Sequence, residues 1–173
     1  GFRDVLEIGR QRRPELYNLH FEKPKPLIPR KYRLEVDERV TWDGKVLRRP
    51  SRGELNAIVD FIRRERIRSV AISLLHSYVN PENEQFIKEF LSERLNGVFI
   101  CASHEVDNKY REYERTSTTV VNAVLMPIVT KYLEYLEREL RDSYPNARLA
   151  IMKSDGGIAP SNYVKKLPIR IIE

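Results

Sequence analysis

The sequence lacks the features that define several large classes of protein. It has one cysteine among 173 residues, Cys101, which excludes an internal disulfide framework and a cysteine-based zinc site. Its longest apolar runs, such as residues 70–75, fall far short of the roughly 18 residues that a membrane-spanning helix needs. A hydrophobic fraction of 41% excludes a wholly disordered chain. What remains is a globular protein of about one domain, and a reducing cytoplasm fits its single thiol.

Several motifs of well-known active sites are absent as well. The chain contains no P-loop, no G-x-S-x-G elbow and no dinucleotide-binding glycine pattern. Cys101 lies in an apolar, strand-like run, where we interpret it as a buried, inert thiol rather than a nucleophile. Of the three histidines, His76 and His104 follow predicted strands and could meet at one sheet edge. Metal binding would need a third ligand, so we predict no metal site.

The net charge of +6 is concentrated in one part of the chain. Residues 1–50 carry 13 basic and 8 acidic side chains, mainly around residues 10–13 and 23–33. Such a stretch can attract phosphates or acidic partners. It lacks the interleaved aromatic residues of single-stranded nucleic-acid binders, so we predict no nucleic-acid partner. We interpret it as solvated surface or as a contact with other parts of the protein, and the alternative is a non-catalytic module that docks an acidic partner.

The first fifty residues divide into two predicted segments. Residues 1–30 contain a short helix over residues 4–9, ended by a glycine, and then a proline-rich stretch that should run in extended form. Residues 31–50 form a predicted antiparallel hairpin insertion, because Asp43-Gly44 between two strand-like runs is typical of a tight turn.

Residues 51–173 alternate between helical and strand-like patterns. Ser51 and Glu54 form a predicted capping box at the first helix, and Asn80 should cap the second. The predicted order is helix 51–66, strand 69–75, helix 80–96, strand 98–102, helix 116–143 capped near Thr116 or Ser117, strand 148–152, helix 162–166 and strand 169–172. Pro127 predicts a kink or a break in the long helix.

This alternation predicts an α/β fold with a mostly parallel sheet and flanking helices. Ligands of such sheets collect at the carboxyl ends of the strands. The loops after residues 75, 102 and 153 are therefore the expected functional edge.

Two segments near that edge carry candidate binding groups. Residues 111–119 place two arginines, two glutamates and four hydroxyls before or within the start of the long helix, where amides favour anions. The alternative is that the glutamates pair with the arginines and a hydroxyl caps the helix. Residues 154–157, Ser-Asp-Gly-Gly, form a tight turn that a ligand could approach closely, although the same sequence also serves as an ordinary turn.

Taken together, these segments resemble the ATP-dependent hydantoinase A/5-oxoprolinase family, which includes N-methylhydantoinase A-like proteins and subunits of acetone and acetophenone carboxylases. The matching segments are spread over the whole chain and are residues 1–11, 23–27, 36–40, 74–81, 111–123, Pro127 and 152–157. Asn83, Val124 and residues 153–155 differ from what family members often have, which leaves the substrate open.

The resemblance implies part of an actin-like (ribonuclease-H-like) ATPase fold and an enzyme that opens a hydantoin or 5-oxoproline-type cyclic amide with ATP and Mg²⁺. The alternative in the same family is a subunit of an ATP-dependent ketone carboxylase. It also implies a hydantoinase B-type partner subunit. The family's main phosphate-binding loops do not match any segment here, so we expect an internal fragment, running from Gly1 to Glu173, that is inactive alone.

The resemblance and the segments above also give a set of candidate residues for binding substrate or phosphate. They are His76, Arg111, Glu114, Arg115, Thr118, Thr119, Asn122, Ser154, Asp155, Gly156 and Gly157. We expect the two arginines to hold an anion, the threonines to donate hydrogen bonds and the turn to bring backbone near the ligand. No catalytic residue and no metal ligand is assigned.

Overall fold

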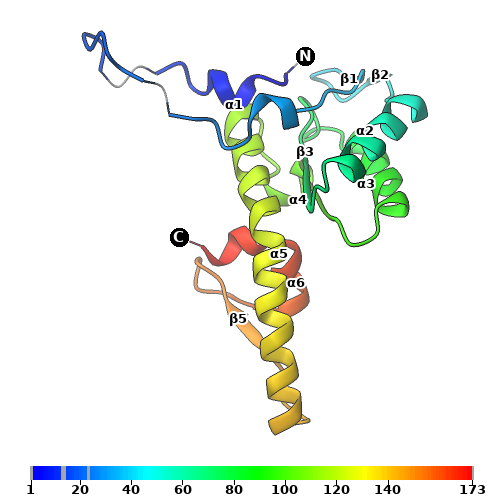
Figure 1. Ribbon diagram of the computed structural model, residues 1–173, viewed down its shortest axis with the longest axis vertical. Coiled ribbons are helices and arrows are strands. Elements are labelled where there is room, and N and C mark those ends of the chain that lie inside the picture. The colour runs from blue at the N-terminus through cyan, green and yellow to red at the C-terminus, as the bar shows by residue number, and fades with distance from the viewer. Residues whose placement is uncertain (1, 13–14, 23, 173) are drawn as a thin grey trace.

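The computed structural model describes residues 2–12, 15–22 and 24–172 (Figure 1). The sequence predictions that involve Gly1, Arg13, Pro14, Lys23 and Glu173 lie outside the described residues. The elements in chain order are α1 (Val5–Ile8), η1 (Arg30–Tyr32), β1 (Arg39–Val40), β2 (Val46–Arg48), α2 (Arg52–Arg64), β3 (Ser69–Ile72), α3 (Glu82–Arg94), β4 (Phe99–Ala102), α4 (Ser103–Val106), α5 (Glu112–Ser143), β5 (Ala150–Met152), β6 (Ile158–Pro160), α6 (Ser161–Lys166) and η2 (Pro168–Ile171). None of the described helices is both long and apolar enough to cross a membrane.

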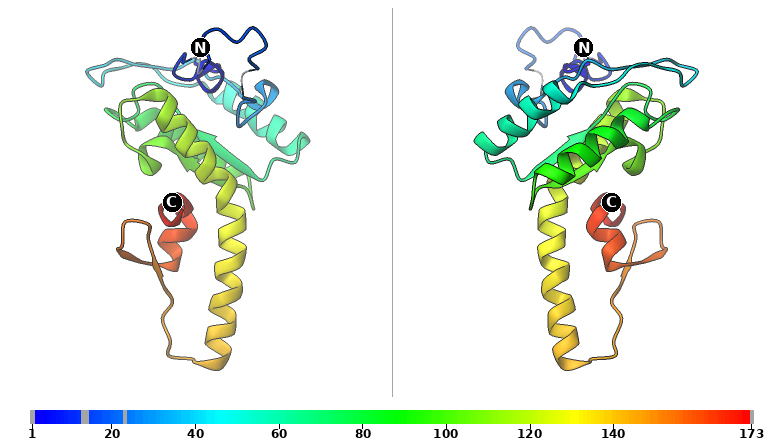
Figure 2. Two further views of the ribbon diagram at one scale, coloured as in Figure 1. Left: turned by 90° about the vertical axis from the view of Figure 1, so that its left-hand side faces the viewer. Right: turned by 90° about the vertical axis from the view of Figure 1, so that its right-hand side faces the viewer.

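A parallel pair of strands, β3 and β4, forms the centre of the upper part of the molecule. Because side chains alternate along a strand, one face presents Ile72, Ile100 and Ala102 to α2 and α3. The other face presents Ala71 and Cys101 to α5. The pair is therefore sandwiched between helices, as Figure 2 shows, which confirms the α/β class.

The predicted mostly parallel sheet is present only in part among the described residues. Their six strands form three separate pairs, and only β3–β4 is parallel. β5 does not join that pair. After the tight turn at residues 154–157 the chain returns, and β5 pairs with β6 in an antiparallel hairpin. The predicted last strand is mostly the 3₁₀ helix η2, since Pro168 fixes the backbone at its start and Asn122 accepts the Ile169 amide.

The predicted hairpin insertion is confirmed as β1–β2, although its strands are shorter than expected. Gly44 adopts the left-handed conformation that the turn requires, with φ of 87°. The preceding residues 33–38 run without a strand partner. They cross to the α2 side, where the Asp37 amide donates to Glu54 at 3.1 Å.

The long helix α5 begins at Glu112, four residues before the predicted cap. Arg111 occupies the cap position without a side-chain hydrogen bond, and Glu112 and Glu114 in the first turn favour the positive end of the helix dipole. The helix continues across Pro127 rather than breaking there. Figure 2 shows that it changes direction between its upper and lower parts, which agrees with the predicted kink.

The lower half of α5 carries a second, smaller core. Leu133 packs with Ala159 of β6 and Val164 of α6. This unit is joined to the upper one through α5 and through the contacts of η2 with the upper core, where Ile169 packs near Cys101. The chain therefore has an upper α/β layer and a lower α/β hairpin unit on one shared helix.

The capping box at α2 gives a first testable prediction. Ser51 Oγ accepts the Glu54 amide at 3.2 Å, and Glu54 accepts the Ser51 amide at 3.0 Å, so both predicted contacts are present. Replacing Ser51 by Ala should lower the free energy of unfolding by about 1 kcal/mol, because an early amide loses its acceptor. Urea unfolding followed by circular dichroism measures this. Ser92→Ala, at an exposed position inside α3, is the matched control and should not destabilise; equal losses from both variants would contradict the prediction.

Candidate functional site

A buried carboxylate fastens the two loops that follow β3 and β4. Glu84 of α3 is fully buried, and its Oε1 accepts the Leu74 amide at 2.8 Å and the Ser103 hydroxyl at 2.7 Å. Its Oε2 accepts the His104 amide at 3.0 Å and lies 2.7 Å from His104 Nδ1. One side chain thus fixes both loops at the carboxyl edge of the parallel pair, where ligands of such sheets bind.

Arg115 of α5 completes this arrangement from the opposite side. Its side chain is fully buried, and its Nε donates to Ser103 at 3.1 Å. The two terminal nitrogens donate to the carbonyl oxygens of Lys109, at 2.5 Å, and of Leu74 and Leu75, each at 2.7 Å. Burial lowers the pKa of Arg115, and the nearby Glu84 carboxylate opposes that shift.

The expectation that Arg115 holds an external anion is therefore corrected. Each of its guanidinium nitrogens already donates to a protein oxygen, because the chain folds the carbonyls of the β3 loop around it. Arg111, one helical turn earlier, is exposed and rests against Tyr110, with its Nε 3.3 Å from the hydroxyl. Of the two arginines, Arg111 alone presents its charge to solvent.

The other candidates of α5 divide between surface and core. Glu114 accepts from Arg10 Nε at 2.6 Å, so its partner comes from the basic first segment and not from a neighbouring arginine. Its pKa is lowered, chiefly by a backbone amide and then by Arg10. Thr119 and Asn122 are fully buried: Thr119 donates to the Arg115 carbonyl at 2.6 Å, and Asn122 binds Lys166 and Ile169 backbone atoms. Thr118 is half-buried.

The turn at residues 154–157 closes the β5–β6 hairpin. Ser154 donates to the Arg170 carbonyl through its amide, at 2.9 Å, and through its hydroxyl, at 3.0 Å. Asp155 accepts from Lys153 at 2.9 Å and from the Gly157 amide at 3.0 Å, and Lys153 lowers the pKa of Asp155. Gly156 needs its positive φ of 83°.

This turn is linked to the β4 edge only indirectly. Arg170, whose carbonyl accepts from Ser154, donates to the Val106 carbonyl at 3.2 Å, at the end of α4. The structure thus brings together the loops after β3 and β4 and the start of α5, and it ties the predicted third loop to them through one arginine.

Sequence reasoning missed Glu84, Ser103 and the link to His104. A signal was available for Glu84: it precedes Ile87 by three and Leu91 by seven residues, so helical spacing places it on the buried stripe of α3. A carboxylate on such a stripe requires partners. Among the residues that the structure describes, no group of three His, Cys, Asp or Glu could hold a metal ion.

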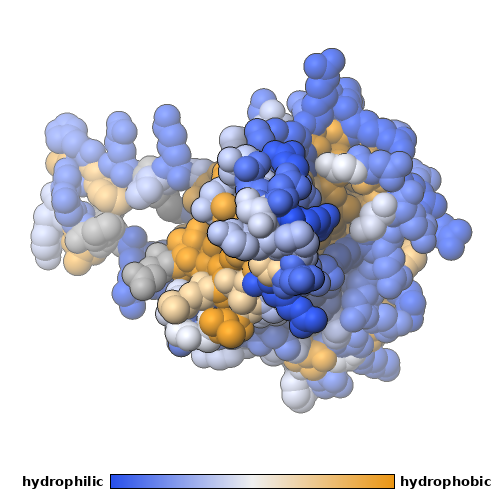
Figure 3. Space-filling model, turned by 90° about the horizontal axis from the view of Figure 1, so that it is seen from below, coloured by the Kyte–Doolittle hydropathy of each residue, from blue (hydrophilic) through white to orange (hydrophobic). Residues whose placement is uncertain are grey.

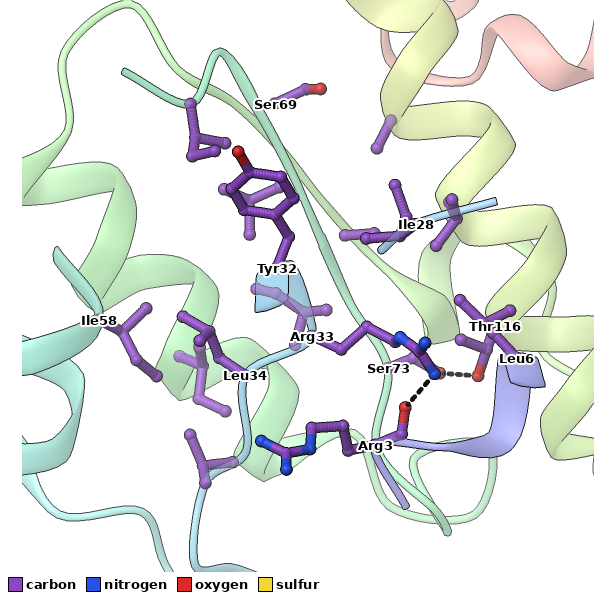
Figure 4. A pocket seen from close by; sticks show the side chains of 18 of the residues that line it. Arg3, Leu6, Ile28, Tyr32, Arg33, Leu34, Ile58, Ser69, Ser73 and Thr116 are labelled. Carbon is purple, nitrogen blue, oxygen red and sulfur yellow. Dashed lines mark hydrogen bonds between the residues drawn. The ribbon is translucent and has the colours of Figure 1, made fainter. Parts of the chain in front are cut away.

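A separate apolar cleft of about 370 Å³ lies along the outer edge of β3. Figure 4 shows it between β3, α2, α5 and the N-terminal segment, with Tyr32 and Arg33 reaching into it. Arg33 is buried there and donates to Glu7 at 2.8 Å and to Asp4 at 3.3 Å, which holds α1 against the cleft. Thr116 and Ser73 bridge its far wall at 2.7 Å.

Below the cleft, α5 carries an exposed apolar stripe. Its members are spaced by four, four and three residues and are each at least half exposed: Val124, Ile128, Tyr132 and Tyr135. Seen from below, the molecule gathers apolar surface toward the middle of this face, with hydrophilic side chains around it (Figure 3).

Two family models match the chain. The hydantoinase/oxoprolinase N-terminal region matches residues 1–95, and the hydantoinase/oxoprolinase model matches residues 115–173. An uncharacterised protein of Methanocaldococcus jannaschii is 44% identical over 100% of this chain and 25% of its own length. The caprolactamase subunit alpha of Pseudomonas jessenii is 32% identical over 99% of this chain and 25% of its own length. The 5-oxoprolinase of Saccharomyces cerevisiae is 28% identical over 91% of the chain and 14% of its own length.

Two solved structures share the fold. The ATP-dependent caprolactamase of Pseudomonas jessenii superposes with a TM-score of 0.84 and 31% identity, covering 98% of this chain and 26% of that one. The nucleotide-free acetone carboxylase gives a TM-score of 0.78 at 22% identity, with 99% and 26% covered, and bears on the fold alone. The chain spans about a quarter of the length of the first two relatives.

The buried arginine yields a prediction about stability. Arg115→Met keeps much of the side-chain volume but removes the donors to four oxygens, and it leaves Glu84 without the nearby positive charge. Breaking a buried, hydrogen-bonded charge arrangement from one side typically costs about 3–5 kcal/mol of unfolding free energy. Arg111→Met, at an exposed position on the same helix start, is the control and should unfold like the parent. Similar midpoints for the two variants in urea would show that the buried network contributes little.

Cys101 yields a prediction about reactivity. Burial raises the pKa of its thiol to about 11, which agrees with the interpretation of an inert cysteine. At pH 8 only about one thiol in a thousand is then ionised, against roughly a quarter of free cysteine. Iodoacetamide at pH 8 should therefore leave native Cys101 unmodified and alkylate it once urea is added. Rapid alkylation of the native protein, read by mass spectrometry, would contradict this.

Proposed function

The chain belongs to the hydantoinase/oxoprolinase family, and we propose that it forms part of an ATP-dependent amidohydrolase that opens a hydantoin or 5-oxoproline-type cyclic amide. The observation that carries the proposal is the superposition on ATP-dependent caprolactamase over 98% of the chain, at 31% identity. Relatives named 5-oxoprolinase support the same reaction class. The relatives are about four to seven times longer, so the activity is proposed for the longer protein in which this chain would lie.

The chemistry of such a reaction sets what this chain would have to contribute. ATP with Mg²⁺ supplies a phosphoryl group that can make the amide oxygen a good leaving group. The described residues offer no three-ligand metal site and the sequence no glycine-rich phosphate loop, so the groups that hold the nucleotide and the ion would come from elsewhere. This chain would supply a rigid wall of the cleft around the substrate.

Within that wall, the exposed and the buried candidate residues would have different roles. Arg111, with its free charge, is the residue placed to meet an anionic group, and His76 and Thr118 would line the same edge. The turn from Ser154 to Gly157 would approach from the hairpin unit. Glu114 is paired with Arg10 and would shape the edge rather than bind a ligand.

The finer fold assignment is also part of the proposal. We place β3 and β4 in a larger sheet of actin-like (ribonuclease-H-like) type, whose other strands come from outside this chain. Two observations support this. Parallel strands occur almost always in sheets that helices cover on both faces, as here, and such sheets usually have more than two strands. The outer edge of β3, without a strand among the described residues, lies open along an apolar cleft.

A partner subunit of hydantoinase B type is proposed as well, in the cytoplasm. Relatives are named as subunits, caprolactamase alpha and acetophenone carboxylase gamma. The exposed stripe on α5 formed by Val124, Ile128, Tyr132 and Tyr135 supports it, since contiguous exposed apolar side chains mark interaction surfaces.

A ketone carboxylase subunit is the second candidate function. It is favoured by the acetophenone carboxylase gamma subunit of Aromatoleum aromaticum, which is 32% identical over 90% of the chain and 23% of its own length. Both candidates use ATP to activate a carbonyl group, so the same wall could serve either.

The test is substrate-dependent ATP hydrolysis by the full-length protein with its partner subunit. We expect ATP consumption to rise with a hydantoin, 5-oxoproline or a lactam and to stay at background with a ketone and bicarbonate. The reverse pattern would select the carboxylase, and no rise with any of these compounds would overturn both. The 173-residue chain alone should show no ATP binding by calorimetry at micromolar concentrations, because it lacks a phosphate loop; measurable binding would contradict the proposed division of labour.

A further inference from the structure

A carboxylate–imidazole pair stands at the carboxyl end of β4 and has no part in the proposed function so far. Glu84 Oε2 lies 2.7 Å from His104 Nδ1 and also accepts the His104 amide at 3.0 Å. These two contacts fix both the backbone and the ring of one residue. The carboxylate is fully buried, whereas 12% of the His104 side chain remains exposed.

The surroundings of Glu84 determine which ring nitrogen carries the proton. Backbone amides can only donate, and Glu84 accepts one at each oxygen, from Leu74 and from His104. The carboxylate therefore acts as an acceptor on both sides, and Nδ1 donates to it. A neutral imidazole protonated at Nδ1 has a free lone pair on Nε2. Among the described residues, no hydrogen bond is made by Nε2, so in the neutral form of the ring it is an acceptor without a protein partner.

A second observation points to a ligand at the same edge. Ser77 and Ser103, whose hydroxyl oxygens are 3.0 Å apart, each adjoin a histidine in sequence, so the turn with His76 lies beside the turn with His104. His76 Nδ1 is buried and has no partner among the described residues. The other buried side-chain polar atoms of these two turns are all paired. An orphan buried nitrogen in an otherwise satisfied cluster needs a partner, which a water, an ion or a ligand can supply.

We propose that His104 is a substrate-binding residue whose Nε2 accepts a hydrogen bond from the ring N–H of the cyclic amide, and that Glu84 is the positioning residue that holds it in this tautomer. The inference rests on the proposed function, because a cyclic amide supplies the neutral N–H donor that this acceptor requires. A simple ketone has no such donor. A site built to accept a substrate N–H also rejects analogues that lack it.

The kinetic test uses the full-length protein with its partner subunit and the cyclic amide that drives ATP hydrolysis best. His104→Phe keeps an aromatic ring but removes the acceptor, and we expect KM for the amide to rise about tenfold with a smaller change in kcat. Glu84→Gln should raise KM in the same direction, because its side chain has one acceptor oxygen where Glu84 has two. It can no longer accept the Leu74 and His104 amides together and so no longer holds the ring in place. The N-methylated amide should be a poor substrate for the parent. Its KM should be similar in the parent and in His104→Phe, because it has no N–H group to donate.

Lys88→Gln is the matched control for these variants. Lys88 lies one turn from Glu84 on α3 and binds Glu105, the residue next to His104, at 2.6 Å on the surface. Its replacement removes an ion pair between α3 and α4 but leaves the contact between Glu84 and His104 intact. The values of KM and kcat should therefore be those of the parent. An unchanged KM in a folded His104→Phe protein would overturn the proposal.

A chemical readout keeps the proposal testable if the variants do not fold. Diethyl pyrocarbonate modifies unprotonated imidazole nitrogens, so His104 of the parent protein should react, and saturating cyclic amide should slow that reaction at least fivefold. Exposed His20 is the internal reference and should react equally with and without the amide. Equal modification of His104 in both conditions, or no modification at all, would overturn the inference. Loss of amide-driven ATP hydrolysis in the parent would instead overturn the proposed function, on which the inference depends.

Discussion

The structure depends on one buried charged network that holds three elements at a single edge. Glu84 of α3 and Arg115 of α5 are both fully buried and meet at Ser103, whose hydroxyl binds each of them. Charges are removed from water at a cost of several kcal/mol each, so this arrangement is stable only because nearly every donor and acceptor is used. Those hydrogen bonds end on the backbone of the loops after β3 and β4. The hydrogen bonds that offset the cost of burying the two charges therefore also fix the position of the carboxyl edge.

The same network separates residues that support the edge from residues that can meet a ligand. Backbone atoms of this chain are the hydrogen-bond partners of the side chains of Arg115, Thr119 and Asn122. Arg111, in contrast, is exposed, with its Nε against the hydroxyl of Tyr110. A residue type alone does not make this distinction. Arg111 is the N-cap residue of α5, with an extended backbone and an exposed side chain, whereas Arg115 lies within the helix and is fully buried.

The sequence predicts best those features whose contacts join residues close together in the chain. The capping box of Ser51 and Glu54 and the turn at Gly44 involve neighbours in the chain, and both appear as predicted. The apolar stripes of α2 and α3 and the β3 and β4 runs need only periodicity. In contrast, the start of η2 depends on Asn122, 47 residues away, which accepts the Ile169 amide. The role of Arg115 depends on Leu74, 41 residues away. A local sequence pattern does not reveal such distant partners. The sequence therefore predicts a strand over residues 169–172 and an anion-binding role for Arg115.

The position of Pro127 connects these local and distant effects. A proline inside a helix removes one backbone hydrogen bond and bends the axis, and here it falls between the part of α5 that covers the parallel pair and the part that carries the hairpin unit. Asn122, five residues before it, binds the backbone of residues 166 and 169 and so fastens this last part of the chain to the upper part. Both cores are packed on this helix, and the stripe from Val124 to Tyr135 is exposed. The direction of α5 thus follows packing on both sides of a proline: the upper part lies against the parallel pair, and the lower part lies against the hairpin unit.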